Sequence, residues 1–146
     1  MARILDGKAL ALEIRREIAG EALRLKNGGV TPGLGVLLVG DDPASRSYVS
    51  AKEKACAEAG IFSREIHLPT SASKYQILDV VNDFNRDDRI HGVLVQFPLP
   101  HAEFQDDVVQ AMDPNKDVDG FHPINVGKLA MGQPTFIPCT PHGILT

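Results

Sequence analysis

Apolar residues recur at two different spacings along this chain, and the spacing changes several times. Between Gly7 and Asn27 they recur every three or four residues, which predicts an amphipathic helix. Its apolar face consists of Leu10, Ile14, Ile18, Ala22 and Leu25. By contrast, Leu34–Val39 is a short continuous apolar run that ends at Gly40. Such a run is typical of a strand that is covered on both faces, as in parallel sheets.

Helix and strand patterns continue to alternate after Gly40. The further elements predicted in this way are a helix over 43–59, a strand over 61–68, a helix over 75–84, a strand over 91–96 and a short helix over 104–112. From Asp113 onward we expect an extended loop with one or two helical turns near 126–130. The alternation predicts an α/β fold, a three-layer domain with a mostly parallel sheet of βαβ units. In such sheets ligands bind beyond the carboxyl ends of the strands, here near Gly40 and 96–100.

Composition and charge exclude several classes of protein. The 146 residues are 43% hydrophobic and 23% charged, which excludes a disordered chain. The net charge of −4 argues against nucleic acid as a partner. Two cysteines are too few for a disulfide framework or a cysteine-based zinc site. A charge interrupts the N-terminus before any apolar run develops, and no apolar stretch is long enough to span a membrane. We therefore expect a cytoplasmic protein without a signal peptide.

Lys52 is the first candidate for chemistry. Projected at 100° per residue, the helix over 43–59 places Lys52 inside an apolar stripe with Tyr48 and Val49, whereas Ser50 falls on the opposite side. Burial disfavours an ammonium group and can leave a neutral amine as a base. Tyr48, one turn earlier, can orient that amine by a hydrogen bond. The alternative is that Lys52 extends along the stripe into water.

Two later polar residues are further candidates. Gln96 follows an apolar strand directly, where its amide can meet a substrate or bind loop amides. The loop from Asp117 to His122 lacks the pattern of a calcium-binding loop, and we predict no metal there. One of its carboxylates can accept two parallel N–H bonds from an amidine-like ligand, or can form an Asx-turn before Gly120. Cys139 has no basic partner in the sequence, and we expect a small buried residue rather than a reactive thiol.

Four motifs in a fixed order carry a more specific signal. They are Tyr48-Val49-x-x-Lys52-x-Lys54, Val95-Gln96-Phe97-Pro98-Leu99-Pro100, Lys116-Asp117-Val118-Asp119-Gly120-Phe121 and Pro138-Cys139-Thr140-Pro141-x-Gly143. Together they resemble the bifunctional methylenetetrahydrofolate dehydrogenase/methenyltetrahydrofolate cyclohydrolase family over essentially the whole chain. Phe97 stands where the family usually has leucine, a difference expected to alter packing more than chemistry.

The resemblance implies an enzyme of one-carbon metabolism, which serves purine and amino-acid biosynthesis. It would interconvert 5,10-methylenetetrahydrofolate, 5,10-methenyltetrahydrofolate and 10-formyltetrahydrofolate by NADP-dependent dehydrogenase and cyclohydrolase steps. The resemblance makes Lys52 the general acid and base, has Tyr48 stack on the folate, has Gln96 position Lys52, and has Asp119 grip the pteridine. The implied substrate-binding residues are Tyr48, Val49, Ser50, Ala51, Lys52, Val95, Gln96, Phe97 and Asp119.

The resemblance also implies a division into domains. Residues 1–146 correspond to the catalytic and folate-binding domain, ending at the start of a linker helix over about 138–146. In the family a separate Rossmann domain binds NADP, and the full-length protein is expected to be a homodimer. This sequence has no Gly-x-Gly-x-x-Gly motif. Two alternatives stay open: a folate-binding module without dehydrogenase activity, and a non-enzymatic α/β interaction domain.

Overall fold

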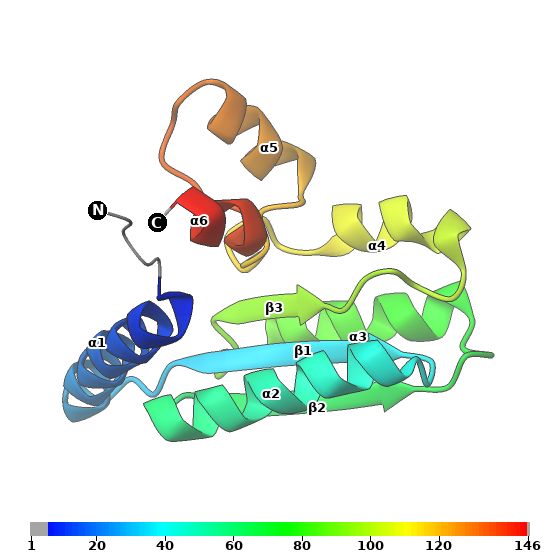
Figure 1. The fold of residues 1–146 in the computed structure, drawn as a ribbon. Coiled ribbons are helices and arrows are strands. Elements are labelled where there is room, and N and C mark those ends of the chain that lie inside the picture. The colour runs from blue at the N-terminus through cyan, green and yellow to red at the C-terminus, as the bar shows by residue number, and fades with distance from the viewer. Residues whose placement is uncertain (1–5, 146) are drawn as a thin grey trace.

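The three predicted strands form one parallel sheet. The computed structural model describes residues 6–145. In it β1 (Gly33–Val39) lies between β2 (Phe62–Leu68) and β3 (Gly92–Val95), and both pairings are parallel. The helix α2 (Pro43–Ala59) connects β1 to β2, and α3 (Lys74–Arg86) connects β2 to β3. Figure 1 shows α2 in front of the sheet and α3 behind it. The predicted α/β fold with a parallel sheet is confirmed.

Neighbouring side chains of β1 supply the core on both faces of the sheet. Val36 and Leu38 join Val49 of α2 in one apolar cluster. Leu37 and Val39 belong to a larger cluster on the opposite face, because successive residues of a strand point to opposite sides. The residues that α3 contributes to the larger cluster are Ile77, Val81 and Phe84. Burial on both faces explains why β1 is a continuous apolar run.

The bounds of α2 follow from its cap residues. The Asp42 side chain accepts a hydrogen bond of 2.7 Å from the Ser45 N–H, and Pro43 occupies the first position of the helix. Gly60 ends the helix in the left-handed conformation, with φ of 74°. These signals are all readable in the sequence, and the predicted helix is confirmed from its first residue to its last.

The first helix, α1 (Gly7–Asn27), also has its predicted bounds, but its apolar face is less buried than expected. Asp6 caps the helix by accepting hydrogen bonds from two N–H groups of the first turn. Ala22 is buried, whereas Ile14, Ile18 and Leu25 remain about 40% exposed. The apolar face is therefore only partly covered at these three residues. The physical reason is that α1 packs on another helix, α2, which covers less of its surface than a sheet does.

The described part of the C-terminal third contains three short helices, close to the segments where helical turns were predicted. A 3-10 turn (Ala102–Phe104) leads into α4 (Gln105–Ala111), and two further helices follow, α5 (Pro123–Ala130) and α6 (Cys139–Leu145). The expected burial of Cys139 is wrong, because this residue begins α6, whose described residues are all exposed. Among residues 6–145, no helix combines the length and the apolar character needed to cross a membrane. The predictions for residues 1–5 and for Thr146 concern parts outside the described residues.

The close contact between β1 and α3 gives a first prediction. A Cβ atom added at Gly35 would lie 2.8 Å from Cγ of the fully buried Phe84 ring. We expect Gly35→Ala to lower the free energy of unfolding by roughly 1–3 kcal/mol, because a packed ring must shift. Denaturant titration measures this change.

Gly20→Ala is the matched control for that substitution. Gly20 lies inside α1, and a Cβ atom there would have no neighbour within 4 Å. The control should raise the free energy of unfolding by about 1 kcal/mol, because alanine favours helix over glycine. Equal effects of the two substitutions would contradict the packing account.

Candidate functional site

A hydrogen bond between Lys52 and Gln96 joins α2 to the end of β3. The Lys52 Nζ donates to Gln96 Oε1 at 3.0 Å. The amide nitrogen of Gln96 donates to the carbonyl of Phe97 at 2.9 Å, so the carbonyl end of the side chain is the one that faces Lys52. The Gln96 main-chain N–H donates to the Leu37 carbonyl of β1, also at 2.9 Å. Gln96 is therefore held at three points, and its acceptor oxygen has a fixed direction.

The register of the sheet explains why a lysine of α2 reaches this glutamine. β3 ends at Val95, which pairs with Leu37, whereas β1 continues to Val39. Gln96 therefore lies level with Leu38, one residue or roughly 3 Å back from the carboxyl end of β1. Lys52 is set back from the same edge, because α2 starts there at Pro43 and runs back along the sheet. The long side chain of Lys52 reaches from the helix to Gln96 at the end of β3.

Lys52 lies in the inward-facing stripe of α2, as predicted. The stripe also holds the buried side chains of Ser45, Val49, Cys56 and Ala59. Lys52 itself is half-buried, with its ammonium turned toward Gln96.

Tyr48 of the same helix does not lie where the sequence placed it. The prediction that Tyr48 belongs to the buried stripe is wrong, because its side chain is 64% exposed. Tyr48 is 100° from Val49 around the helix, which turns its ring to the open side. No hydrogen bond joins Tyr48 to Lys52 among the described residues. Ser50 and Ala51 are exposed, and Ser50 points about 160° away from Lys52.

Asp119 reaches the same region through a loop that runs beside β3. The loop forms an isolated parallel bridge between Asp117 and Val93. In this bridge the Val93 N–H donates to the Lys116 carbonyl at 2.6 Å, and the Val118 N–H donates to the Val93 carbonyl at 3.4 Å. Asp119 lies in the turn directly after the bridge, close enough to Lys52 for the two charges to interact. The loop thus brings a carboxylate to the end of β3.

The electrostatic surroundings of Asp119 set it apart from a surface aspartate. Its side chain is partly buried, and burial raises the pKa of its carboxyl group. The Lys52 ammonium acts in the opposite direction and the Asp117 carboxylate in the same direction, but burial has the largest effect. No hydrogen bond to the Asp119 carboxylate is found within residues 6–145. Its oxygens are available to a donor outside the protein.

The remaining polar residues of this loop have partners within the fold. The Asp117 carboxylate accepts a hydrogen bond from the His122 N–H at 2.8 Å. The His122 ring nitrogen Nδ1 accepts one from the Ile124 N–H at 3.1 Å and caps α5. No group of three side chains able to ligate a metal is found among the described residues. The Asp117 carboxylate and the His122 ring thus each bind a main-chain N–H of their own segment.

Two residues that fix this loop were given no role by the sequence. Lys116 donates from Nζ to three carbonyls at the end of α3, those of Phe84, Asn85 and Asp87. Asn125 is buried and donates to the Asp117 carboxylate at 2.9 Å. In the sequence, Lys116 stands out only as the first residue of a motif. Asn125 lies in a segment predicted as loop, where a lone asparagine carries no signal.

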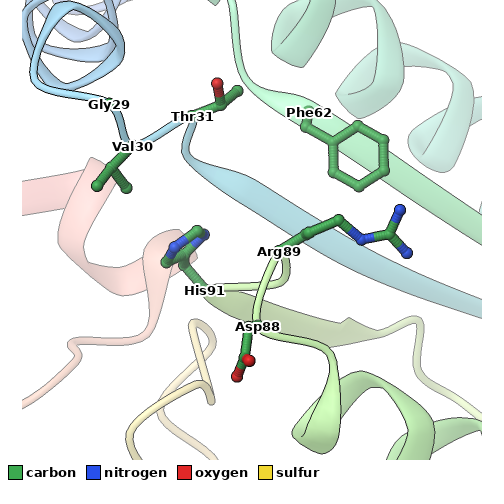
Figure 2. Close-up of a pocket in the computed structure, with 7 residues that line it drawn as sticks. All are labelled: Gly29, Val30, Thr31, Phe62, Asp88, Arg89 and His91. Carbon is green, nitrogen blue, oxygen red and sulfur yellow. The ribbon is translucent and has the colours of Figure 1, made fainter.

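Of two surface cavities formed by the described residues, one borders the site region. A cavity of about 470 Å³ lies between α4 and the rings of Phe97 and Phe121, whose centroids are 6.0 Å apart. The other, of about 520 Å³, lies at the opposite end of the sheet (Figure 2). It is lined by Gly29, Val30, Thr31, Phe62, Asp88, Arg89 and His91.

The cavity at the amino ends of the strands contains none of the predicted site residues. In Figure 2 the Arg89 side chain extends toward the Phe62 ring, and its guanidinium lies 5.8 Å from the ring centroid. The same guanidinium binds Asp87, and His91 Nδ1 accepts a hydrogen bond from the Gly33 N–H. These polar groups already have partners. Parallel sheets bind ligands at the other end, where Lys52, Gln96 and Asp119 meet.

Comparison with known proteins identifies the family. The family model for the tetrahydrofolate dehydrogenase/cyclohydrolase catalytic domain matches residues 5–119. The chain is 52% identical to the bifunctional protein FolD of Geotalea daltonii and 57% identical to that of Pelobacter propionicus, each over 145 residues. These matches cover 99% of this chain and 52% and 51% of the two relatives. The chain spans about half the length of the curated relatives that it matches.

Solved structures agree with this result. The FolD methylenetetrahydrofolate dehydrogenase/cyclohydrolase of Campylobacter jejuni superposes with a TM-score of 0.92 at 46% identity, covering 96% of this chain and 50% of that one. The FolD enzyme of Trypanosoma brucei, solved with NADP cofactor and an inhibitor, gives a TM-score of 0.93 at 30% identity, covering 99% and 50%. This chain belongs to the tetrahydrofolate dehydrogenase/cyclohydrolase family, and it corresponds to the catalytic domain.

Proposed function

We propose that this chain binds a reduced folate at the carboxyl end of β3 and carries the residues for the cyclohydrolase step, the hydrolysis of 5,10-methenyltetrahydrofolate to 10-formyltetrahydrofolate. The observation that carries the proposal is the 3.0 Å hydrogen bond from Lys52 Nζ to Gln96 Oε1, with Asp119 close by. Residues 1–146 are then the catalytic and folate-binding unit of a bifunctional enzyme. Family membership supports this reading.

Lys52 has the chemistry that the hydrolysis needs. In the first step a water oxygen bonds to the cationic methenyl carbon, and the amine of Lys52 takes one proton from that water. In the second step the bond from this carbon to one ring nitrogen breaks, and the Lys52 ammonium returns a proton to that nitrogen. The hydroxyl proton leaves to solvent as the formyl C=O forms. The sum is addition of one water and release of one proton.

Gln96 keeps Lys52 in place during these transfers. Its side-chain carbonyl accepts from Lys52 Nζ, and its own direction is fixed by the bond to the Phe97 carbonyl. A hydrogen bond of this kind restricts the amine to one position, which is the advantage of a preorganised catalytic group. The mobile four-carbon stem of a lysine makes such a restraint necessary.

Asp119 and the exposed aromatic rings suit the pteridine and its attached ring. The Asp119 carboxylate can accept two parallel N–H bonds from the aminopyrimidine part of a pteridine. Tyr48, with 64% of its side chain exposed, offers a ring face on which a planar ligand can stack. The exposure that removes Tyr48 from the core leaves it free for this role. Phe97 and Phe121 add apolar surface beside the site.

The dehydrogenase step requires NADP, which accepts the hydride when it is bound. The turn from β1 to α2 is where such a sheet would hold a pyrophosphate, but it carries Asp41 and Asp42. The Asp42 carboxylate already occupies the Ser45 N–H, and this bond lowers the pKa of Asp42. Two carboxylates at a helix N-terminus disfavour an anion. This turn thus does not fit the pyrophosphate of NADP. We propose that a further domain binds it in a full-length homodimer.

Substitution of Lys52 tests the chemistry directly. Lys52→Met should reduce hydrolysis of 5,10-methenyltetrahydrofolate by roughly 100-fold or more, because the proton carrier is lost. The measurement is the decay of the methenyl absorbance. Lys26→Met, at an exposed lysine of α1, is the control and should hydrolyse at the parent rate. Comparable rates for Lys52→Met and the parent would overturn the assignment.

Substitution of Asp119 should separate binding from stability. Asp119→Asn replaces a charged acceptor by an amide whose NH2 faces the donors of the ligand. We expect the binding free energy for tetrahydrofolate to weaken by roughly 2–4 kcal/mol. Titration calorimetry measures the dissociation constant. An unchanged constant would show that Asp119 has only a structural role in its turn.

The same variant should be more stable than the parent at neutral pH. Because the folded state raises the pKa of Asp119, the folded protein binds more protons than the unfolded chain between the ordinary value of 3.8 and the raised value. Ionisation of Asp119 therefore reduces stability as the pH rises through this range. Thermal melts should show a higher midpoint for Asp119→Asn at pH 7 and no difference below the ordinary value. A lower midpoint at pH 7 would contradict the account.

A further inference from the structure

The carboxylate of Asp117 is buried in an unusual way. The residue has no exposed surface, and its Oδ2 accepts hydrogen bonds from the His122 N–H at 2.8 Å and from Asn125 Nδ2 at 2.9 Å. Its Oδ1 is also buried, and no described residue donates a hydrogen bond to it. No ion pair to Asp117 is found within residues 6–145. A buried charge without an ion-pair partner lowers the stability of the folded state.

Asn125 extends this contact to two other segments of the chain. Its Nδ2 also donates to the Pro114 carbonyl at 2.9 Å, and its Oδ1 accepts from Thr135 Oγ1 at 2.9 Å. Every hydrogen of the Asn125 amide and its oxygen therefore have partners. The pair of Asp117 and Asn125 joins the loop beside β3, the helix α5 and the segment that precedes α6.

These bonds surround the turn that carries Asp119. Gly120 has a φ of +68°, and a Cβ atom there would lie 2.7 Å from the Phe136 carbonyl oxygen. The Gly120 N–H donates to the Asp117 carbonyl at 3.3 Å. Asp119 lies between these two contacts and has no hydrogen bond of its own to hold its carboxylate. Its position is set by Asp117 on one side and by the close approach to Phe136 on the other.

An asparagine at position 117 would hold the same two donors without a buried charge. Its side-chain carbonyl accepts two hydrogen bonds, as Oδ2 of Asp117 does. The hydrogen bonds alone therefore do not require a carboxylate. The charge of Asp117 does act on Asp119, where it disfavours ionisation. The position of Asp119 thus depends on the hydrogen bonds of Asp117 and not on its charge.

We propose that Asp117 is a positioning residue for substrate binding, which together with Asn125 holds the Asp119 carboxylate where it meets the folate. This inference rests on the proposed function, and it adds a residue that does not touch the substrate. Asp117 acts on binding through Asp119, whereas Lys52 and Gln96 are held by α2 and β3. Loss of Asp117 therefore affects affinity for the substrate and leaves the chemical step largely unchanged.

The test compares Asp117→Ala with Asp117→Asn in the 146-residue chain. Calorimetric titration with tetrahydrofolate gives the dissociation constant, and methenyltetrahydrofolate hydrolysis gives KM and kcat. Asp117→Ala should raise the dissociation constant and KM by about tenfold and change kcat by less than about threefold. Asp117→Asn should keep the dissociation constant and KM within about threefold of the parent values, because its side-chain carbonyl still accepts hydrogen bonds from His122 and Asn125.

Two further variants control for general damage to the fold. His91→Ala removes the acceptor of the Gly33 N–H at the opposite end of the sheet, and it should leave the dissociation constant unchanged. Thr135→Val removes only the hydrogen bond from Thr135 to Asn125. This variant serves as the test in place of Asp117→Ala if Asp117→Ala does not fold. It should raise the dissociation constant by about threefold, with kcat unchanged. Circular dichroism confirms that each variant is folded at the temperature of the titration.

The outcomes separate this inference from the proposed function. If the parent does not bind tetrahydrofolate, the proposed function fails and the inference with it. If the parent binds and Asp119→Asn loses affinity while Asp117→Ala and Thr135→Val bind as the parent does, only the inference fails. A loss of kcat without a change in KM, or equal losses in Asp117→Ala and Asp117→Asn, would also overturn it. A raised KM that Asp117→Asn reverses supports it.

Discussion

The pairing register of β3 with β1 is the constraint on which the candidate site depends. Because Val95 pairs with Leu37, β3 ends short of the edge, and the first residue after it, Gln96, lies at the depth that Lys52 reaches from α2. The same strand forms the bridge at Val93 that brings the loop with Asp119 alongside. A shift of β3 by one residue would turn the apolar side chains of the strand to the wrong faces. The core therefore fixes the geometry of the site.

Several side chains at the carboxyl end of the sheet lack the hydrogen bonds or the burial that stabilise the core. Asp119 is partly buried without a hydrogen bond among the described residues, and burial raises its pKa. Asp117 keeps a buried oxygen without a described donor. Tyr48 exposes most of its ring on the surface of α2. Functional sites are where a fold departs from the rules that stabilise it, because their groups are arranged for a ligand.

The sequence predicted the elements better than it predicted the contacts between them. The ends of α2 were readable because Asp42, Pro43 and Gly60 act within one turn of the helix. Helical periodicity also placed Lys52 on the inward face, but it assigned Tyr48 to that face, because a 100° step is too coarse to locate the edge of a stripe. Contacts across the fold, such as that of Asn125 with Asp117, leave no local pattern. Local patterns alone do not show that Lys52 meets Gln96; the family resemblance implied it, and the register of the sheet explains it.

The central claim is that a folate binds at the carboxyl end of β3 and not in the cavity at the amino ends of the strands. The most direct measurement is a map of backbone amide chemical shifts as tetrahydrofolate is titrated into the chain. The account predicts that the amides of residues 95–97 and 118–121 shift, and that those of Val30, Phe62 and His91 stay unchanged. Shifts confined to the residues around the cavity of Figure 2 would contradict the account.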